Sequence, residues 1–252
     1  MIDWGSGRYE ETAKELMPAA EHVVAMSGVG HGDLFLDVGC GTGNAAAVAA
    51  TAGAHVTGVD PAQRLLEVAA ARVPAGTFLR AGAEELPFDA EVFDAAASLF
   101  GVIFATDRRA AVREMLRVVR PGGCVLITAW RPDGPIHEAI AAMTRGLPMP
   151  PPPPGRLEFE DPAAAAPELR ALGAEVTVHD AQISFSQPSA QAWLDDGEAN
   201  HPMAIAGAAA QRAAGRYDAV RADALEILEA ANEDPQGWRV TSRYIVYELR
   251  PG

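Results

Sequence analysis

The sequence predicts an α/β fold, because short apolar runs typical of buried strands are followed by turns and helix-like segments. Residues 34–38 form one such run, and they pass through a glycine-rich turn into an Ala-rich segment over residues 44–52 that predicts a helix. Residues 56–60 (VTGVD) predict a second strand that ends in an acid. The chain has 252 residues, of which 49% are hydrophobic, so it can bury the core of one α/β domain with additional elements.

The turn after the first strand has the spacing Gly39-x-Gly41-x-Gly43. Glycines lack a Cβ atom, so the backbone can turn sharply and a ligand can contact main-chain N–H groups near the start of the helix. A dinucleotide-binding turn has the spacing G-x-G-x-x-G, which would place the third glycine where this chain has Asn44. Two residues before the first glycine, Asp37 supplies a carboxylate that suits an ammonium group and repels a diphosphate. The turn therefore predicts a cofactor site and disfavours a pyrophosphate ligand.

This arrangement resembles the first motif of class I S-adenosylmethionine-dependent methyltransferases. The second predicted strand ends in Asp60, and the resemblance implies that this carboxylate accepts hydrogen bonds from both ribose hydroxyls of the cofactor. The spacing between the turn and Asp60 also suits a nicotinamide enzyme. Residues 81–88 resemble the adenine loop of the family, with Gly82 where the family has an aspartate. The backbone of Ala83 or the carboxylate of Glu84 would then have to bind the adenine.

Two further segments match the family in the expected order. Residues 93–100 resemble its fourth strand, and residues 118–123 resemble the turn before a fifth strand over residues 124–130. The resemblance covers residues 34–130 and implies a Rossmann-like α/β fold with a seven-stranded, mostly parallel sheet, an antiparallel last strand and helices on both faces. The implied cofactor is S-adenosyl-L-methionine, with S-adenosyl-L-homocysteine as product. The cofactor-binding residues that the resemblance implies are Tyr9, Asp37, Gly39, Cys40, Gly41, Gly43, Asp60, Pro61, Ala83, Glu84, Ser98 and Phe100.

Before the first strand, residues 1–33 predict an N-terminal helical segment. Apolar residues recur at helical spacing over residues 8–27. In relatives this element folds over the methionine end of the cofactor. Trp4 and Tyr9 precede or open the helix, and two roles stay open for them: a lid over the sulfonium or plain anchoring of the helix.

After the fifth strand, residues 148–154 are rich in proline and predict an extended polyproline segment. We expect a stiff loop at the mouth of the active site, with a docking site for a proline-binding domain as the alternative. Residues 161–172 then predict a capped helix closed by Gly173, followed by a sixth strand over residues 174–185.

Residues 187–236 separate this strand from a last strand over residues 239–249, and they are too many for a turn. Apolar residues at helical spacing over residues 219–228 predict helices. We expect one methyltransferase domain over residues 1–252, in which residues 34–130 bind the cofactor and residues 187–236 form a helical cap. The cap should lie beside the carboxyl ends of the strands and select the acceptor.

A sulfonium methyl group is already activated, so the protein must mainly hold the acceptor in line and exclude water. A hydroxyl or acidic carbon acceptor would benefit from a general base, and the candidates are His137, Asp195, Asp196, Glu198 and His201. His201 is the best of them because it lies at an expected helix break in the cap, although a lone histidine is usually not catalytic. Four histidines without a partner pattern are set aside: His22, His31, His55 and His179.

The formal charge of −14 disfavours a nucleic-acid partner, because phosphate binding relies on clustered Lys and Arg. Lys14 is the only lysine, and the arginine and alanine richness is typical of a GC-rich bacterial genome. Cys40 and Cys124 are interpreted as buried small hydrophobes, so neither a disulfide nor a metal site is predicted. The sequence shows no signal peptide and no apolar run of membrane-spanning length, so we expect a cytoplasmic protein.

The sequence predicts a methyltransferase that acts on a small molecule through an O, C or N atom. It resembles the ubiquinone/menaquinone-biosynthesis-like branch, whose members methylate quinones, sterols and many specialised metabolites. One alternative is an enzyme of the same fold that binds the same cofactor and catalyses cyclisation or another rearrangement. A weaker alternative is a nicotinamide oxidoreductase, which Asn44 and Asp37 oppose. A homo-oligomer is left open.

Overall fold

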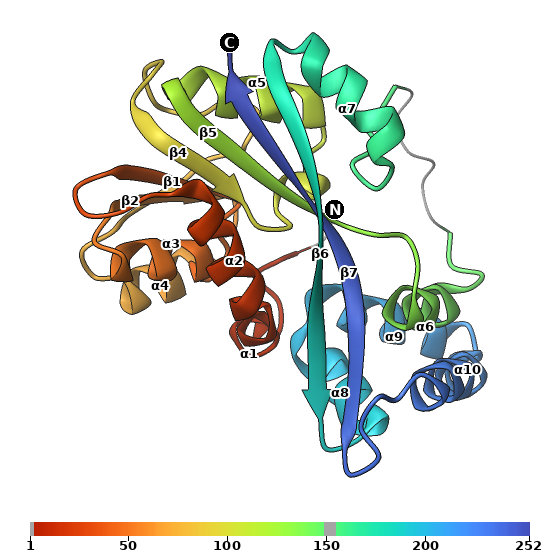
Figure 1. The fold of residues 1–252 in the computed structure, drawn as a ribbon. Coiled ribbons are helices and arrows are strands. Elements are labelled where there is room, and N and C mark those ends of the chain that lie inside the picture. The colour runs from red at the N-terminus through yellow and green to blue at the C-terminus, as the bar shows by residue number, and fades with distance from the viewer. Residues whose placement is uncertain (1–2, 149–154) are drawn as a thin grey trace. The chain divides into compact units, whose positions relative to one another are not determined.

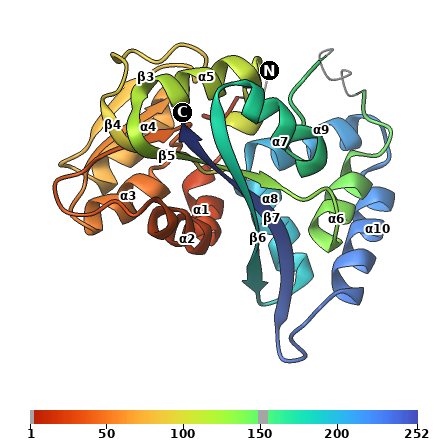
Figure 2. The same cartoon turned by 45° about the horizontal axis from the view of Figure 1, so that its top comes forward.

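The computed structural model describes residues 3–148 and 155–252. It contains a seven-stranded sheet with the strand order β3-β2-β1-β4-β5-β7-β6. The strands other than β3 are labelled in Figure 1, and β3 is labelled in Figure 2. β1 is parallel to β2 and β4, β2 to β3, and β4 to β5, whereas β7 is antiparallel to β5. The predicted mostly parallel sheet with an antiparallel last strand is confirmed. The strands are β1 (Leu34–Val38), β2 (His55–Asp60), β3 (Thr77–Arg80), β4 (Phe93–Ser98), β5 (Val119–Trp130), β6 (Ala174–Gln187) and β7 (Trp238–Pro251).

The chain divides into two compact units, which we call the core unit and the cap unit. The core unit consists of Leu16–Trp130, the described part of Pro153–Ala181, and Tyr244–Gly252. The cap unit consists of Gln182–Arg243 and the described parts of Met1–Glu15 and Arg131–Pro152. β6 and β7 contribute residues to both units. The expected single domain with a cap over residues 187–236 stays a prediction.

Helices cover both faces of the sheet in the core unit, as predicted (Figure 2). One face carries α2 (Met17–Ser27), α3 (Asn44–Thr51) and α4 (Gln63–Arg72), and the other carries α5 (Arg108–Val118) and α7 (Pro162–Ala171). β1 and β4 are almost completely buried because helices cover both of their faces. The predicted capped helix is α7, whose N-cap Asp161 accepts the Ala163 N–H at 3.0 Å.

The structure corrects two local predictions. The single helix predicted over residues 8–27 is divided into α1 (Tyr9–Ala13), a 3-10 helix (Lys14–Leu16) and α2, which has a proline in its first turn. Proline favours a new helix start because its missing N–H would be unpaired there in any case. In place of the turn predicted over residues 118–123, Val118 ends α5 and residues 119–123 form the irregular first part of β5, where the register against β4 shifts and Gly122 has a φ of +84°.

The cap unit confirms the predicted helices between β6 and β7: α8 (Ala190–Asn200), α9 (Pro202–Ala213) and α10 (Tyr217–Ala230). It also contains α1 and α6 (Pro135–Thr144), a helix that the sequence patterns do not predict. Fully buried Gln211 in α9 donates to the carbonyl groups of Met143 and Arg145 at 2.8 and 2.9 Å, which ties α9 to the end of α6. Most of the predicted polyproline segment, residues 149–154, lies outside the described residues.

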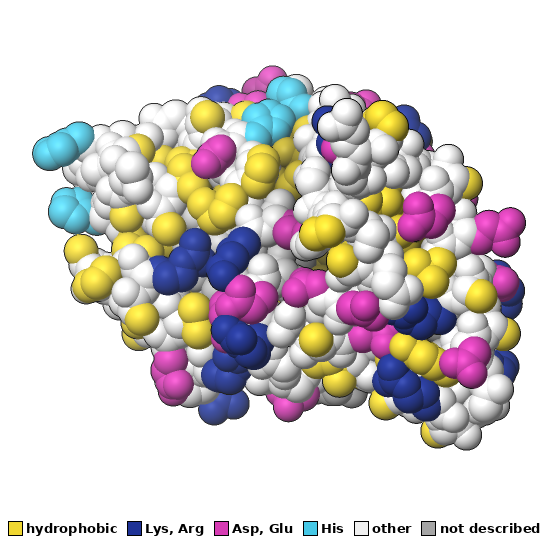
Figure 3. Space-filling view, turned by 90° about the horizontal axis from the view of Figure 1, so that it is seen from below, with side chains coloured by type: hydrophobic (Ala, Val, Ile, Leu, Met, Phe, Trp, Pro, Cys, Tyr) yellow, Lys and Arg dark blue, Asp and Glu magenta, His cyan; other side chains and the backbone are white. Residues whose placement is uncertain are grey.

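The distribution of charged side chains and the burial of the two cysteines can be compared with the expectations from composition. On the face drawn in Figure 3, basic side chains lie among acidic ones and form no continuous basic surface. Cys40 and Cys124 are buried and unpaired, as predicted, and burial raises the pKa of both thiols. Over residues 3–148 and 155–252, no helix has the length and apolar character needed to cross a membrane.

Candidate functional site

The glycine turn connects β1 to α3 in the core unit. Gly39, Gly41 and Gly43 have φ values of +66°, +50° and +76°, a left-handed conformation that other residues rarely adopt. The turn is attached to β2, because the N–H groups of Gly39 and Cys40 donate to the Val59 carbonyl at 2.8 and 3.0 Å. The structure therefore presents a glycine backbone at the carboxyl end of β1, where open α/β sheets bind ligands.

Asp60 ends β2 beside this turn. Its Oδ2 atom accepts the Gly41 N–H at 2.9 Å, and its Oδ1 atom accepts the Ala62 N–H at 2.8 Å. The residue is 8% exposed, and burial raises its pKa despite the opposing effect of the two backbone hydrogen bonds. Each carboxylate oxygen has more than one lone pair. The anchored side chain can therefore accept further hydrogen bonds from a ligand.

Asp37 lies in β1, one residue before the strand ends. It is 1% exposed, and its Oδ2 atom accepts the Ala46 N–H from the first turn of α3 at 3.0 Å. Burial is the largest cause that raises the pKa of Asp37 to about 7, and the nearby charge of Asp60 acts in the same direction. In the described part of the chain, no basic side chain forms an ion pair with Asp37. A cationic ligand group nearby would favour its ionised form.

The predicted adenine loop follows β3, and Pro61 directly follows Asp60 at the end of β2. Because β2 and β3 are parallel neighbours, their following segments meet at one edge of the sheet. Ala83 and Glu84 are half-buried, and Glu84 Oε1 accepts the Thr106 N–H at 2.9 Å. The structure thus brings these loop residues to the edge that carries Asp60, and their contact with adenine stays a prediction.

Ser98 ends β4 and holds the next segment against the glycine turn. Its fully buried hydroxyl donates to the Val38 carbonyl at 2.7 Å and accepts the Val102 N–H at 3.0 Å. A Cβ atom on Gly39 would lie 3.0 Å from the Gly101 Cα atom, so the two segments are in close contact. Ser98 therefore fixes the geometry of this edge, and its predicted contact with the cofactor stays a prediction.

Phe100 lies in the same segment, and the structure surrounds it with aromatic residues that sequence reasoning missed. Its ring stacks on Trp130 with 3.9 Å between ring centroids and an interplanar angle of 3°. The ring of Tyr244 lies edge-on at 5.6 Å from Phe100. The position of Trp130 at the carboxyl end of a predicted strand could have identified it. Tyr244 gave no local signal, because only the pairing of β5 with β7 brings it here.

Two histidines that were set aside for lack of a partner do have partners. His22 Nδ1 lies 2.9 Å from the Tyr244 hydroxyl, and His179 Nε2 lies 3.0 Å from a Glu248 carboxylate oxygen. In both pairs the partner comes from β7, far away in the sequence, so the sequence pattern could not show it.

In the cap unit, Tyr9 and His201 come together with Trp4. The His201 ring centroid lies 5.3 Å from that of Tyr9 and 5.9 Å from that of Trp4, each edge-on. The predicted helix break is confirmed, because His201 ends α8 and caps α9, where its Nδ1 atom accepts the Met203 N–H at 3.3 Å. Burial lowers the pKa of His201 and so favours the neutral imidazole that a general base requires.

The other candidate bases are less suited to proton transfer. Glu198 accepts hydrogen bonds from the Tyr217 hydroxyl at 2.5 Å and from Arg221 at 3.1 Å, and Asp195 also pairs with Arg221. These ion pairs join α8 to α10. The remaining two candidates are exposed His137 on α6 and half-buried Asp196 on α8.

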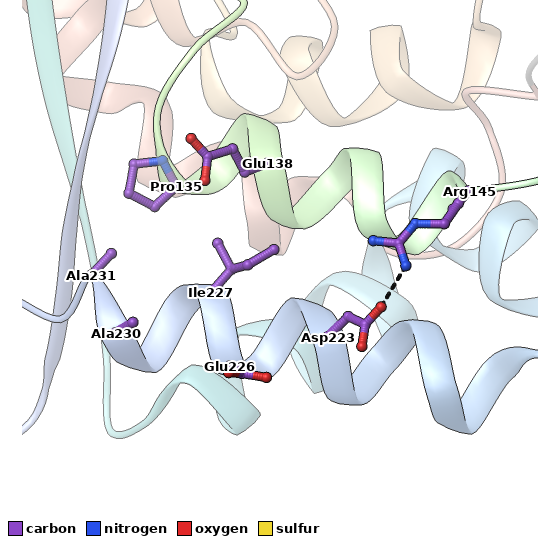
Figure 4. Close-up of a pocket in the computed structure, with 8 residues that line it drawn as sticks. All are labelled: Pro135, Glu138, Arg145, Asp223, Glu226, Ile227, Ala230 and Ala231. Carbon is purple, nitrogen blue, oxygen red and sulfur yellow. Dashed lines mark hydrogen bonds and ion pairs between the residues drawn. The ribbon is translucent and has the colours of Figure 1, made fainter.

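A groove between α6 and α10, with a volume of about 530 Å³, is a separate feature of the cap unit (Figure 4). The Arg145–Asp223 ion pair, with 2.6 Å between nitrogen and oxygen, crosses one end of it. The groove contains none of the predicted cofactor-binding residues, and we assign it no function. Its lining consists of Pro135, Glu138, Arg145, Asp223, Glu226, Ile227, Ala230 and Ala231.

Comparison with known proteins identifies the core unit. Residues 36–127, from β1 into β5, match the family model described as a methyltransferase domain. The chain contains a methyltransferase domain. The motifs predicted as class I S-adenosylmethionine-dependent methyltransferase motifs lie in this matched region, so the recognition from sequence is confirmed.

The curated relatives match part of the chain. An uncharacterized protein of Mycobacterium tuberculosis is 42% identical over 136 residues, which are 52% of this chain and 50% of that protein. A demethylmenaquinone methyltransferase of Clavibacter sepedonicus is 38% identical over 99 residues, which are 38% of this chain and 40% of that enzyme. The chain spans about half the length of the first curated relatives it matches.

Solved structures share the fold of the methyltransferase domain and its additions. YcgJ from Bacillus subtilis aligns with a TM-score of 0.60 at 17% identity, over 93% of this chain and 98% of that protein. The [4+2]-cyclase SpnF aligns with a TM-score of 0.56 at 23% identity, over 98% of this chain and 84% of that chain. At these identities the likeness concerns the fold alone.

Proposed function

We propose that this protein transfers the methyl group of S-adenosylmethionine to a small-molecule acceptor. The observation that carries the proposal is the Asp60 carboxylate, which is hydrogen-bonded to the glycine turn within a methyltransferase domain. An anchored acid beside a turn of three left-handed glycines suits a ligand that carries ribose hydroxyls and lies close to the backbone.

The residues of the core unit fit this cofactor. Asp60 accepts the ribose hydroxyls, and the segment with Ala83 and Glu84 binds the adenine. Asp37 is buried, has a pKa of about 7 and is not paired with a basic side chain of the described chain, so the ammonium group of the methionine moiety compensates its charge. The same carboxylate would repel a diphosphate.

The chemistry requires little from the protein beyond placement. S-adenosylmethionine supplies an activated methyl group on a positively charged sulfur. The acceptor atom forms a bond to the methyl carbon while the C–S bond breaks, and the electron pair of the C–S bond stays on sulfur. If the acceptor carries a proton, this proton passes to a base or to the buffer. Holding the two reactants in line can lower the activation barrier by about 7–11 kcal/mol. Excluding water prevents hydrolysis.

The cap unit is the source of acceptor selectivity in this proposal. Tyr9, Trp4 and His201 form an aromatic cluster there, and the lowered pKa of His201 keeps its imidazole neutral and able to accept a proton. The acceptor is an O, C or N atom of an aromatic or quinone-like metabolite. The likeness to a demethylmenaquinone methyltransferase makes reduced quinones the first class to test.

The test is incubation of the protein with methyl-labelled S-adenosylmethionine and separate panels of reduced quinones, phenols and polyketides. We expect a labelled organic product and equimolar S-adenosylhomocysteine. Conversion of a substrate without label transfer would favour the cyclisation alternative. Binding of NADH in a fluorescence titration, with no binding of S-adenosylhomocysteine, would overturn the cofactor assignment.

A further inference from the structure

Phe100 has an unusual backbone conformation beside the proposed cofactor site. Its φ is +54°, in the left-handed region, where a residue with a side chain is strained by about 1–2 kcal/mol. Glycine would adopt this conformation without strain, so the phenylalanine ring is held at this position at an energetic cost. Strained residues of this kind cluster at functional sites.

The surrounding core-unit residues hold this conformation. The Phe100 N–H donates to the Thr128 hydroxyl at 2.8 Å, and both residues are buried. The ring lies flat on half-buried Trp130, and Tyr244 packs edge-on against both rings. Tyr244 is in turn hydrogen-bonded to His22 on α2. Three elements therefore fix the Phe100–Trp130 pair in one orientation.

With the ligand placed as in the proposed function, the strand order puts this pair on the side of the glycine turn to which the sulfur extends. In the proposed function, adenine lies at the end of β3 and ribose at the end of β2. The sulfur is bonded to the ribose side of the ligand, so it lies farther along the same edge, over the glycine turn after β1. The next strands in the sheet are β4 and β5. Phe100 follows β4, and Trp130 ends β5.

We propose that the stacked Phe100–Trp130 pair recognises the positive charge of the sulfonium and so discriminates S-adenosylmethionine from its neutral product. This inference rests on the proposed function. The faces of aromatic rings attract cations, most strongly for indole and where water is excluded. No acidic side chain is needed for this interaction, and a soft, delocalised partner leaves the methyl group free to transfer.

The consequence is a difference between substrate and product binding. Methyl transfer converts the sulfonium into a neutral thioether, which removes the attraction to the rings while all contacts to adenosine and the methionine end remain. We expect the wild-type protein to bind S-adenosylmethionine about five- to tenfold more tightly than a variant without the aromatic pair does. The wild type and this variant should bind S-adenosylhomocysteine with equal affinity.

The experiment measures dissociation constants by calorimetry for three ligands: S-adenosylmethionine, S-adenosylhomocysteine, and an analogue with a protonated amine in place of the sulfonium. Trp130→Leu and Phe100→Leu keep apolar side chains at both positions and should weaken the two cationic ligands about five- to tenfold. The neutral product should change less than twofold. Trp130→Phe restores an aromatic ring and should recover most of the loss.

A matched control removes an aromatic ring elsewhere in the core unit. Phe159 is fully buried and packs against Tyr247, so Phe159→Leu should lower stability and leave the ratio of the dissociation constants unchanged. A second measurement replaces tryptophan by fluorinated tryptophans in the wild-type chain, which changes the charge distribution of the ring with little change of shape. Affinity for the cationic ligands should fall stepwise with fluorine number, and in Trp130→Phe this trend should vanish.

Equal weakening of cationic and neutral ligands in the leucine variants, or fluorination without effect on their ratio, would overturn the inference and leave the proposed function intact. A wild-type protein that binds neither S-adenosylmethionine nor S-adenosylhomocysteine would overturn both.

Discussion

The Asp60 carboxylate and the Gly41 N–H are joined by a hydrogen bond of 2.9 Å that connects the end of β2 to the glycine turn after β1. The side chain proposed to bind ribose therefore also fixes the backbone over which the ligand lies. A ligand that binds Asp60 meets a turn that is already ordered, and this preorganisation lowers the entropy lost on binding.

Replacing Asp60 by alanine should raise the dissociation constant for S-adenosylhomocysteine at least tenfold. Hydrogen bonds to a charged group contribute about 1.5–3 kcal/mol, and the variant loses those to ribose together with the support of the turn. Calorimetric titration of the folded variant measures the effect. Asp89→Ala, at an exposed position after the adenine loop, is the control and should bind as the wild type does. An increase below threefold for Asp60→Ala would mean that the ribose is held elsewhere.

Replacing Gly41 by valine should abolish cofactor binding. The φ of +50° strains a β-branched residue, and the added methyl groups occupy the turn that the ligand must approach. Gly28→Val provides a matched control, because Gly28 has a φ of +70° but faces open space at the end of α2. Both variants should unfold at lower temperature in a thermal melt, and Gly28→Val alone should retain normal affinity for S-adenosylhomocysteine. Near-normal affinity in folded Gly41→Val would contradict the site assignment.

Local patterns explain which parts of the fold were predictable. Strands β1 and β4 and residues 124–129 of β5 are mostly apolar and buried, so each could be located from sequence as an apolar run. The mixed sequence of β2 could be located because it lies between the glycine turn and Asp60. β3 could not be located, since this short edge strand is mostly exposed and shows neither a continuous run nor an alternating pattern. The apolar spacing of the N-terminal segment continues through the break at residues 14–16, so the sequence predicts one helix where the structure has two.

The candidate site was likewise predictable only where a local sequence pattern encodes it. The glycine turn and Asp60 are signalled by residue type and spacing within one β-α-β unit. The stack of Phe100 on Trp130 and the His22–Tyr244 hydrogen bond depend on which strands become neighbours. Spacing along the chain does not encode such pairings, so these residues emerged only from the folded structure.

The stability of the protein should depend on the ionisation of Asp37. An unfolded aspartate has a pKa of about 3.9, whereas burial raises the pKa of Asp37 to about 7 in the folded state. Between these pH values the folded protein holds a proton that the unfolded chain has lost. The contribution of Asp37 to the free energy of unfolding is therefore full below about pH 4, falls as the pH rises, and is lost above about pH 7. The total decrease in the free energy of unfolding over this range is at most about 4 kcal/mol.

Denaturant unfolding of the wild type and Asp37→Asn at several pH values tests this dependence. Asparagine keeps an oxygen that can accept the Ala46 N–H and has no proton to lose in this range. The difference in free energy of unfolding between the two proteins should grow in favour of Asp37→Asn from about pH 4 to about pH 7. A difference that is constant with pH would show that folding does not raise the pKa of Asp37.

His201 offers a test that separates a role in proton transfer from a role in structure. It caps α9 by accepting the Met203 N–H, and its ring packs against Tyr9. Asparagine is also a good N-cap residue but cannot act as the base, whereas alanine provides neither function. We expect both variants to lose turnover of an identified hydroxyl acceptor by about 100-fold or more, the range typical of general base catalysis.

The two variants should differ in stability and agree in cofactor affinity. His201→Ala should lose about 1 kcal/mol relative to His201→Asn because the cap is missing. Affinity for S-adenosylhomocysteine should stay within about twofold of the wild type in both, equal to about 0.4 kcal/mol, because the predicted cofactor residues other than Tyr9 belong to the core unit. Full turnover in His201→Asn, with loss only in His201→Ala, would assign His201 to capping and packing. The proton would then have to leave through another group or through water.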